Sequence, residues 1–386
     1  MTADTSTIFV ATRAPLRLQR IETFALEAPI ERPVRNSWRT LTTRSALVVR
    51  VIAADGAQGW GEVWCNYPPR AAQHRADLVK LVAAPLLIDR EFEGPEHVFR
   101  FLEQALRIPS IQSGEPGPFA QVAAGIDNAV WDLAARRAGQ PLWKYLGGVP
   151  TVEVYASGLS PDEPAPIAAQ AVRNGFRAAK LKVGMESALD RRNAAAVRAE
   201  LGDGGKLMLD ANQRWAPDEA RSAIRELAEF KPEWIEEPIP ADEPLSVWKA
   251  LARASPVPLA AGENLRGRAA FDEYISSAAV HFLQPDMGKW GGFTECLPLG
   301  RRAIAAGIRF CPHWLGGAIG LLSSLHLLGA AGGFGWGEFD ANPNPLRERL
   351  WPSDLVVNDG RITLGHAPGI GFEPDPRVLK EFAMKN

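Results

Sequence analysis

Acidic side chains recur at almost constant spacing in the second half of this chain, each after a short apolar run. Asp210 ends the run LMLD, Glu236 lies in WIEEP, and Glu263 lies in PLAAGEN, so the two intervals between them are nearly equal. Carboxylates brought together repel one another unless a cation lies among them, and all-oxygen ligands favour Mg²⁺ or Mn²⁺ over Zn²⁺. We therefore predict a divalent metal site, with salt bridges to lysines as the alternative. Side chains alternate along a strand, so only one of Glu236 and Glu237 is expected to face the site; we choose Glu236, although spacing alone does not decide.

Two lysines, Lys180 and Lys182, lie two positions apart in AAKLKVG (178–184) and share one face if this segment is a strand. A lysine is a poor base at its reference pKa of about 10.4. A second ammonium group close by, together with partial burial, lowers that pKa and frees a neutral amine. One interpretation is therefore that Lys180 activates Lys182 as a base. The other is that both lysines only neutralise the carboxylates.

An aspartate and a histidine repeat the same spacing further along the chain. Asp286 lies in PDMGKWGG (285–292), and His313 lies in CPHW (311–314), at the same interval that separates Glu236 from Glu263. A carboxylate beside an imidazole fixes the tautomer of the ring and raises its basicity. We expect this pair to face the predicted metal. The other histidines show no spacing typical of zinc ligands, which argues against a zinc hydrolase; they are His74, His97, His281, His326 and His366.

Glu338 in GWGEFD (335–340) is a further candidate at a strand end. Among so many negative charges it would become protonated and donate a hydrogen bond. The alternative is that Glu338 lies on the exterior of the barrel, because Asp340 shares its face of the strand.

Eight strand-like segments carry these residues. The segments begin at nearly even intervals along the chain and alternate with alanine-rich helical stretches; they are VEVYASG, AAKLKVG, KLMLDAN, WIEEP, PLAAGEN, HFLQPD, IRFCPH and WGEFD. Repeated strand-plus-helix units of this number indicate a parallel barrel, in which functional residues lie at the carboxyl ends of the strands. An open doubly wound sheet is the alternative, but no G-x-G-x-x-G motif follows the first strand.

The part of the chain before these segments follows another pattern, typical of an antiparallel meander with the turn ADGAQG and then several helices. The segment VVNDGRITL (356–364) predicts another hairpin, so the tail is expected to return to the first domain. We therefore predict an α+β capping domain over residues 1–148, completed by residues 355–386, and a barrel domain over residues 149–354.

Composition excludes several classes of protein. The formal net charge of −2 gives no basic field for nucleic acid and no lysine-rich face for a membrane. Three widely spaced cysteines suit a reducing compartment better than a disulfide scaffold. We see neither a signal peptide nor an apolar run long enough to cross a bilayer, and expect a cytoplasmic protein.

The arrangement resembles the enolase superfamily, and within it the mandelate racemase subgroup. The resemblance covers nearly the whole chain, and the motifs that carry it are AAGIDNAVWDLAARRAGQPLWKYLGG, KLK (180–182), LDAN (209–212), IEEP (235–238), AGEN (261–264), PDMGKWGG (285–292) and PHW (312–314). It implies a modified TIM barrel, (β/α)₇β, beneath an α+β capping domain, with Mg²⁺ on Asp210, Glu236 and Glu263.

The same resemblance implies roles for the remaining site residues. Lys182 would be the base on one face of the substrate, with Lys180 tuning it, and His313, oriented by Asp286, would act on the other face. Glu338 would hydrogen-bond a carboxylate oxygen of the substrate, and Asn212 is assigned to substrate binding. Lys289 is interpreted as structural or as a residue of the pocket rim.

Two loops of the capping domain, RNSWRT (35–40) and EVWCNYPPR (62–70), are expected to close over the barrel mouth. Their side chains would bind hydroxyl groups or a distal carboxylate of the substrate. Alternatively, they would only pack the loops against the barrel. The candidates are Arg35, Asn36, Trp64, Asn66 and Tyr67. The expected partner is a small carboxylate substrate, and the protein is expected to form a homo-oligomer.

By resemblance we expect abstraction of the proton α to a carboxylate and dehydration of a sugar acid to a 2-keto-3-deoxy acid. Racemisation or epimerisation of a 2-hydroxy acid is the alternative reaction. A non-catalytic barrel that binds a metal and a carboxylate is the third hypothesis, although such a protein would not need two opposed proton-transfer groups.

Overall fold

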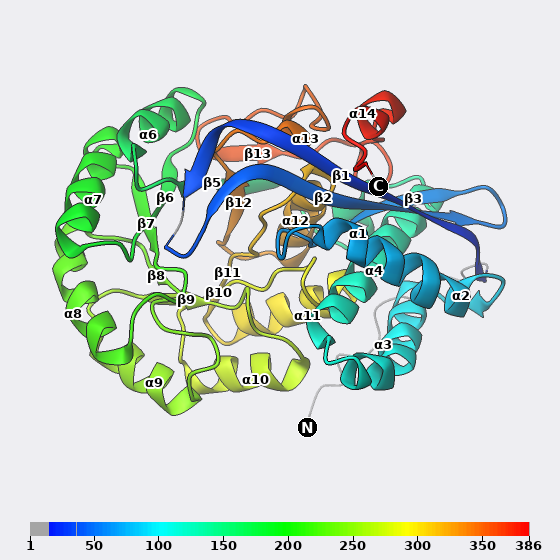
Figure 1. The fold of residues 1–386 in the computed structure, drawn as a ribbon, viewed down its shortest axis with the longest axis horizontal. Coiled ribbons are helices and arrows are strands. Elements are labelled where there is room, and N and C mark those ends of the chain that lie inside the picture. Colours follow the sequence, from blue (N-terminus) through cyan, green and yellow to red (C-terminus); the bar gives the residue numbers. More distant parts are fainter. Residues whose placement is uncertain (1–14, 36, 386) are drawn as a thin grey trace.

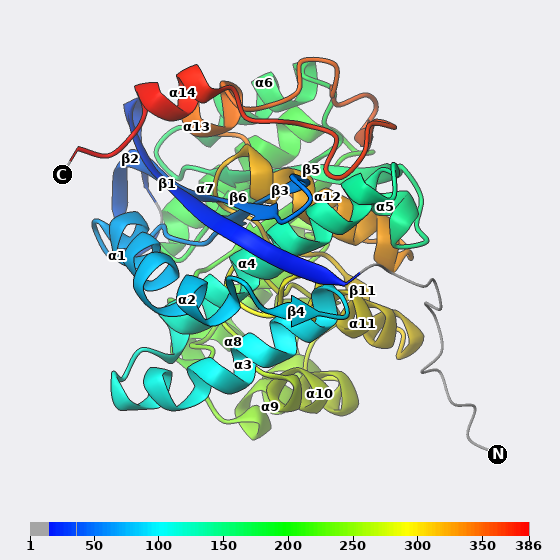
Figure 2. The same ribbon diagram turned by 90° about the vertical axis from the view of Figure 1, so that its right-hand side faces the viewer.

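The computed structural model describes residues 15–35 and 37–385. Asn36, one of the candidate substrate-binding residues, lies outside the described residues. Within them, the strands form one four-stranded sheet and one nine-stranded sheet. Figure 1 shows the barrel built by the larger sheet beside the smaller sheet and its helices, and Figure 2 gives the view from the side of those helices.

The smaller sheet is antiparallel, in the order β3-β2-β1-β4. Its strands are β1 (Leu16–Arg35), β2 (Thr40–Ala53), β3 (Gln58–Val63) and β4 (Glu91–Phe92). The helical segments that follow are α1 (Ala71–Leu78), the π-helical turn η1 (Val79–Ala83), α2 (Ala84–Leu87), α3 (Pro95–Gln112), α4 (Pro116–Arg137) and α5 (Leu142–Tyr145). The long strands β1 and β2 extend from these helices across to the β5 side of the barrel (Figure 1).

Glycines let β3 lie directly on α4. A Cβ atom added to Gly59 would lie 2.2 Å from the carbonyl oxygen of Ala129, and one added to Gly61 would lie 2.3 Å from that of Gly125. Because Cβ atoms do not approach backbone atoms so closely, larger residues would force strand and helix apart. This contact fixes the carboxyl end of β3, from which Glu62 and the second capping loop extend.

The larger sheet runs in the order β11-β10-β9-β8-β7-β6-β5-β12, with all of these neighbours parallel. Its strands are β5 (Thr151–Leu159), β6 (Ala178–Lys182), β7 (Lys206–Asp210), β8 (Ile235–Glu236), β9 (Leu259–Ala261), β10 (Phe282–Leu283), β11 (Arg309–Phe310) and β12 (Trp336–Asp340). The helical segments between them are α6 (Pro164–Arg173), α7 (Ser187–Leu201), α8 (Pro217–Leu227), the 3₁₀ turn η2 (Ala228–Phe230), α9 (Leu245–Ala254), α10 (Arg268–Ser277), α11 (Gly292–Ala305) and α12 (Ala318–Ala331). The predicted parallel barrel and the separate antiparallel sheet are confirmed, and the barrel is nearly closed.

The C-terminal segment touches both parts of the molecule. It contains α13 (Pro345–Glu348), β13 (Arg361–Thr363) and α14 (Pro376–Glu381). Asp359 and Gly360 have positive φ angles of 48° and 75°, as the predicted tight turn requires. However, β13 pairs with β5 of the barrel, and the chain returns to the smaller sheet only later, where the amide of Met384 donates to the carbonyl oxygen of Ala25. The domain limits given above remain a prediction.

An apolar plug fills the barrel interior. Each strand, or the residue next to it, contributes one buried side chain to the plug: Tyr155, Ala178, Met208, Trp234, Ala260, Phe282, Cys311 and Trp336. The rings of Trp234 and Phe282 lie 4.8 Å apart. The plug closes the barrel from below, so polar side chains on the same inner face gather above it. Among the described residues, no helix is long and apolar enough to cross a membrane.

Candidate active site

The candidate site is the next layer of inward-facing side chains above the plug. Because side chains alternate along a strand, the residue two positions after each member of the plug faces the barrel interior again. This rule gives Ser157, Lys180, Asp210, Glu236, Gly262, Gln284, His313 and Glu338. Apart from glycine all are polar, and all are buried at the carboxyl end of the barrel.

The three predicted metal ligands come from neighbouring strands. Asp210 and Glu236 are direct partners in the register of β7 and β8. Glu263 follows Gly262, whose φ of 146° turns the chain at the end of β9 and brings the next side chain into the mouth. All three carboxylates are buried.

Each of these carboxylates contacts a different lysine. Lys182 donates to Asp210. The Nζ atom of Lys180 lies 2.7 Å from Glu236 Oε2, and that of Lys289 lies 2.6 Å from Glu263 Oε2. In the described ranges, no three carboxylate, imidazole or thiol groups converge closely enough to enclose an ion as they stand.

The donor set nevertheless fits a hard divalent cation. It consists of three buried carboxylates, and the side-chain oxygen of Asn212, beside Asp210, is buried without a hydrogen-bond partner. Oxygen donors of this kind suit Mg²⁺.

The two lysines of β6 differ in their surroundings. Lys180 is completely buried and bridges Glu236 and Glu338, the latter at 2.8 Å. Burial lowers the pKa of Lys180, but the two carboxylates outweigh burial and raise it well above its ordinary value. Burial and the Lys180 charge also lower the pKa of Lys182, yet Asp210 leaves the net pKa raised. The positive charge of Lys180 thus lowers the pKa of Lys182, as expected. The nearby carboxylates have the larger effect, so the pKa of Lys182 is raised overall.

Asp286 and His313 form the predicted pair. His313 Nδ1 lies 2.7 Å from Asp286 Oδ2, and His313 Nε2 lies 3.2 Å from Glu263 Oε2. Burial lowers the pKa of His313, but Glu263, Glu338 and Asp286 together raise it to about 9. The imidazole therefore lies across the barrel mouth from β6, held on one side by Asp286.

Glu338 is inside the barrel and not on the exterior. Its carboxylate accepts from Ser157 Oγ and contacts Lys180. Burial raises the pKa of Glu338, but Lys180 and His313 outweigh burial and lower the pKa to about 2. The expectation of a protonated Glu338 is thus wrong, because Lys180 supplies the positive charge that favours the ionised form.

Glu237, the other carboxylate of the pair, is also buried. The strand β8 ends at Glu236, and Glu237 has a left-handed φ of 38°. This turn directs its carboxylate to Asn264, whose Nδ2 lies 2.9 Å away. Burial and the charge of Glu263 raise the pKa of Glu237 well above its ordinary value.

The first capping loop reaches the barrel mouth. Ser37 Oγ donates to the carbonyl oxygen of Ala211 at 3.1 Å, next to Asp210. Arg35 does not point into the mouth but pairs with Asp162 of the β5–α6 loop at 3.1 Å.

The second capping loop packs on the barrel loops and on the first capping loop. Lys289 Nζ lies 4.9 Å from the centre of the Trp64 ring, and Asn66 donates to the carbonyl oxygen of Leu315. Tyr67 is half exposed and packs edge-on against Trp38. These contacts agree with the packing interpretation of the two loops.

Sequence reasoning missed two residues of the site. Ser157 and Gln284 belong to the inner layer, and Gln284 Nε2 lies 2.7 Å from Glu236 Oε2. Both could have been found from the sequence, because Ser157 lies two positions after Tyr155 and Gln284 two positions after Phe282, both residues of the plug. Lys289, interpreted above as structural or as part of the rim, contacts Glu263 and so lies beside the carboxylates.

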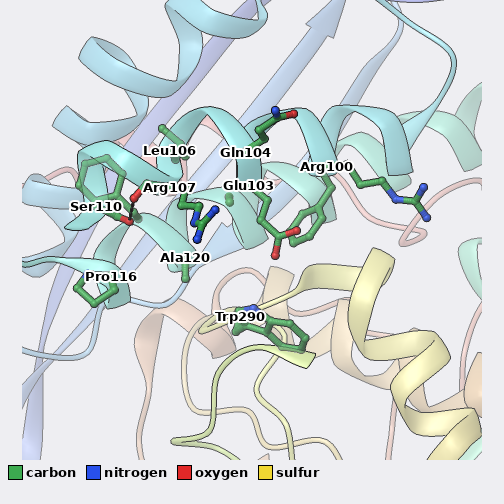
Figure 3. Close-up of a pocket in the computed structure, with 12 residues that line it drawn as sticks. Arg100, Glu103, Gln104, Leu106, Arg107, Ser110, Pro116, Ala120 and Trp290 are labelled. Atoms are coloured by element: carbon green, nitrogen blue, oxygen red, sulfur yellow. Dashed lines mark hydrogen bonds between the residues drawn. The ribbon is translucent and has the colours of Figure 1, made fainter. Parts of the chain in front are cut away.

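A groove of about 490 Å³ between α3, α4 and Trp290 is separate from this site and contains none of the predicted site residues (Figure 3).

Two family models together match most of the chain. The model described as "Mandelate racemase / muconate lactonizing enzyme, N-terminal domain" matches residues 20–147, and "Enolase C-terminal domain-like" matches residues 165–378.

Relatives of known activity are enzymes of several kinds. The chain is 29% identical to D-galactarolactone cycloisomerase of Agrobacterium fabrum, over 96% of this chain and 99% of that protein. It is 32% identical to L-talarate/galactarate dehydratase of Salmonella typhimurium, over 86% of this chain and 81% of that protein. It is also 27% identical to L-Ala-D/L-Glu epimerase of Bacillus subtilis, over 92% and 97%.

Solved structures match along nearly the whole length. A mandelate racemase/muconate lactonizing enzyme from Bordetella bronchiseptica RB50 is 47% identical with a TM-score of 0.90, covering 95% of this chain and 99% of that one. A racemase from Streptomyces coelicolor A3(2) with bound magnesium is 28% identical with a TM-score of 0.85, covering 95% and 100%.

Proposed function

Because this chain belongs to the mandelate racemase/muconate lactonizing enzyme family of the enolase superfamily, we propose that it is a Mg²⁺-dependent acid-sugar dehydratase. It removes the proton α to the carboxylate of a sugar acid, and loss of a β-hydroxyl then gives a 2-keto-3-deoxy acid. The dehydratase relative supports this choice of reaction.

One observation carries the proposal. Lys182 on β6 and the Asp286–His313 pair at the ends of β10 and β11 flank the same three carboxylates from two sides of the barrel. A protein that only binds a ligand needs no proton-transfer group on each side.

The position of each residue gives it a separate role in the proposed reaction. Lys182 takes the α proton, which requires its amine to leave Asp210 and lose its own proton first. His313, held by Asp286, protonates the departing β-hydroxyl from the other face. Lys180 stays paired with Glu338 and keeps that carboxylate ionised.

Asp210, Glu236 and Glu263 would hold the metal. Mg²⁺, when bound, supplies positive charge that stabilises the negative charge developing on a carboxylate oxygen.

The test is incubation with Mg²⁺ and a panel of sugar acids in D₂O, followed by assay for 2-keto acids and for α-deuterium. Keto acid formation that disappears with EDTA and in Lys182→Ala is expected. Stereoinversion with incorporation of deuterium and no keto acid would instead support an epimerase, the alternative that the Bacillus subtilis relative favours. Absence of exchange with every acid would favour the non-catalytic barrel.

A further inference from the structure

The loops that carry Asp286 and His313 lie against the antiparallel sheet and α4, which form the cap. The Asp286 loop leads into α11, and the His313 loop leads into α12. The amide of Trp64 donates to the carbonyl oxygen of Gly288 at 3.4 Å, so the end of β3 touches the first of these loops. Asp286 therefore lies on a loop whose backbone is in contact with the cap.

Glu62 of β3 connects the cap to the His313 loop. Its carboxylate accepts from the amide of Gly317 at 2.5 Å and from that of Gly320 at 2.9 Å, at the N-terminus of α12. The negative charge lies at the positive end of the helix, where it is stabilising. Glu62 is buried, and burial raises its pKa to about 7.

Asp127 of α4 makes the matching connection to the Asp286 loop. Its carboxylate accepts from the amide of Thr294 at 3.0 Å and from the Thr294 hydroxyl at 2.6 Å, in the first turn of α11. Asp127 is completely buried. Two buried carboxylates of the cap thus bind the N-termini of two consecutive barrel helices.

The Lys182 side of the site is held differently. The loop after β6 is fixed by Asp190 of the next barrel helix, α7, which accepts from the amides of Gly184 at 2.8 Å and Met185 at 3.2 Å. This contact lies within the barrel and involves no residue of the cap.

We propose that Glu62 and Asp127 are positioning residues through which the cap sets the Asp286–His313 pair, whereas the loop that follows Lys182 is held by Asp190 of the barrel. The cap then controls proton transfer on the His313 face separately from the Lys182 face. The part that concerns proton transfer rests on the proposed function; the part that concerns the position of His313 does not.

The test uses the full-length variants Glu62→Gln and Asp127→Asn. Both substitutions keep the size of the side chain and remove its charge. Glu62→Gln presents an NH₂ group to one of two buried amides, which loses its acceptor. Asp127→Asn presents one to Thr294, whose hydroxyl can then no longer donate to this side chain if its amide keeps its acceptor. Asp190→Asn is the matched control, because it makes the same change in a buried carboxylate that holds the Lys182 loop. Thermal denaturation identifies the variants that remain folded.

The first readout is α-proton exchange in D₂O for both C2 epimers of a sugar acid, one with its α proton facing Lys182 and the other with its α proton facing His313, which acts as the base for that epimer. We expect exchange on the His313 face to fall about 10–100-fold in Glu62→Gln and Asp127→Asn, because small displacements of reacting groups have effects of this size. Exchange on the Lys182 face is expected to stay unchanged in these variants and to fall in Asp190→Asn.

The second readout needs no substrate. In protein labelled with ¹⁵N-histidine, the His313 signals, identified by their loss in His313→Asn, report the Nδ1 hydrogen bond to Asp286. We expect them to shift in both cap variants and to stay in place in Asp190→Asn.

Equal loss on both faces, or unshifted His313 signals in folded cap variants, would overturn the proposal. If the wild-type protein exchanges no sugar acid, the proposed function fails, while the His313 signals still decide whether the cap positions this residue.

Discussion

Replacing Lys180 by methionine tests whether the inner layer depends on one buried cation. Lys180 is completely buried, and its ammonium group contacts Glu236 at 2.7 Å and Glu338 at 2.8 Å. Methionine has similar length and no charge, so it fills the space and leaves two buried carboxylates without their shared partner. Removing one member of a buried ion pair typically costs about 3–5 kcal/mol of unfolding free energy. The remaining hydrogen bonds of Glu236, to Trp234 and Gln284, place the expected loss within that range.

The assay is urea denaturation in the presence of EDTA, so that only protein groups balance the carboxylates. Lys206→Met is the control, because Lys206 pairs with Glu233 at 2.6 Å while half exposed. An exposed pair of this kind contributes less than about 1 kcal/mol. If Lys180→Met loses no more stability than Lys206→Met, the inner layer does not depend on Lys180 and the electrostatic account of the site fails.

Three further outcomes are expected. Burial lowers the pKa of His326 from 6.5 to about 4, so the unfolded chain binds more protons between these values; unfolding free energy should fall by about 3 kcal/mol as pH falls through this window, and urea titrations of His326→Gln should lack this component. A Cβ on Gly320 would lie 1.8 Å from the Trp314 ring, so Gly320→Ala should lose about 1–3 kcal/mol and shift tryptophan fluorescence; an unchanged melting temperature and spectrum would contradict this packing. Mg²⁺ at a hundred times its Kd should add about 2.7 kcal/mol of stability, and a thermal-shift series should show this gain in the wild type but not in Asp210→Asn.

Much of the inner layer was predictable because strand geometry is local. The spacing of strand-like segments indicated a barrel, and the carboxyl ends of those segments held Lys182, Asp210, Glu236 and His313. The two-residue period that places Trp234 in the plug also places Glu236 above it. A reader of the sequence needs only the strand and its direction to assign such residues to one face.

The contacts made outside the strands were not predictable in this way. Glu237 is buried because the chain turns with a positive φ, and Arg35 pairs with Asp162 although its loop reaches the mouth. Lys289 lies in a loop whose path no periodicity describes, yet it contacts Glu263.

The sequence by itself determined which side chains face the barrel interior, since alternation along a strand requires no knowledge of the rest of the molecule. Only the tertiary structure decided how those side chains pair and what holds their loops. Glu62 and Gly317 are 255 residues apart in the chain. Their contact follows from how the cap packs on the barrel, and packing depends on the whole set of buried surfaces and not on any local pattern.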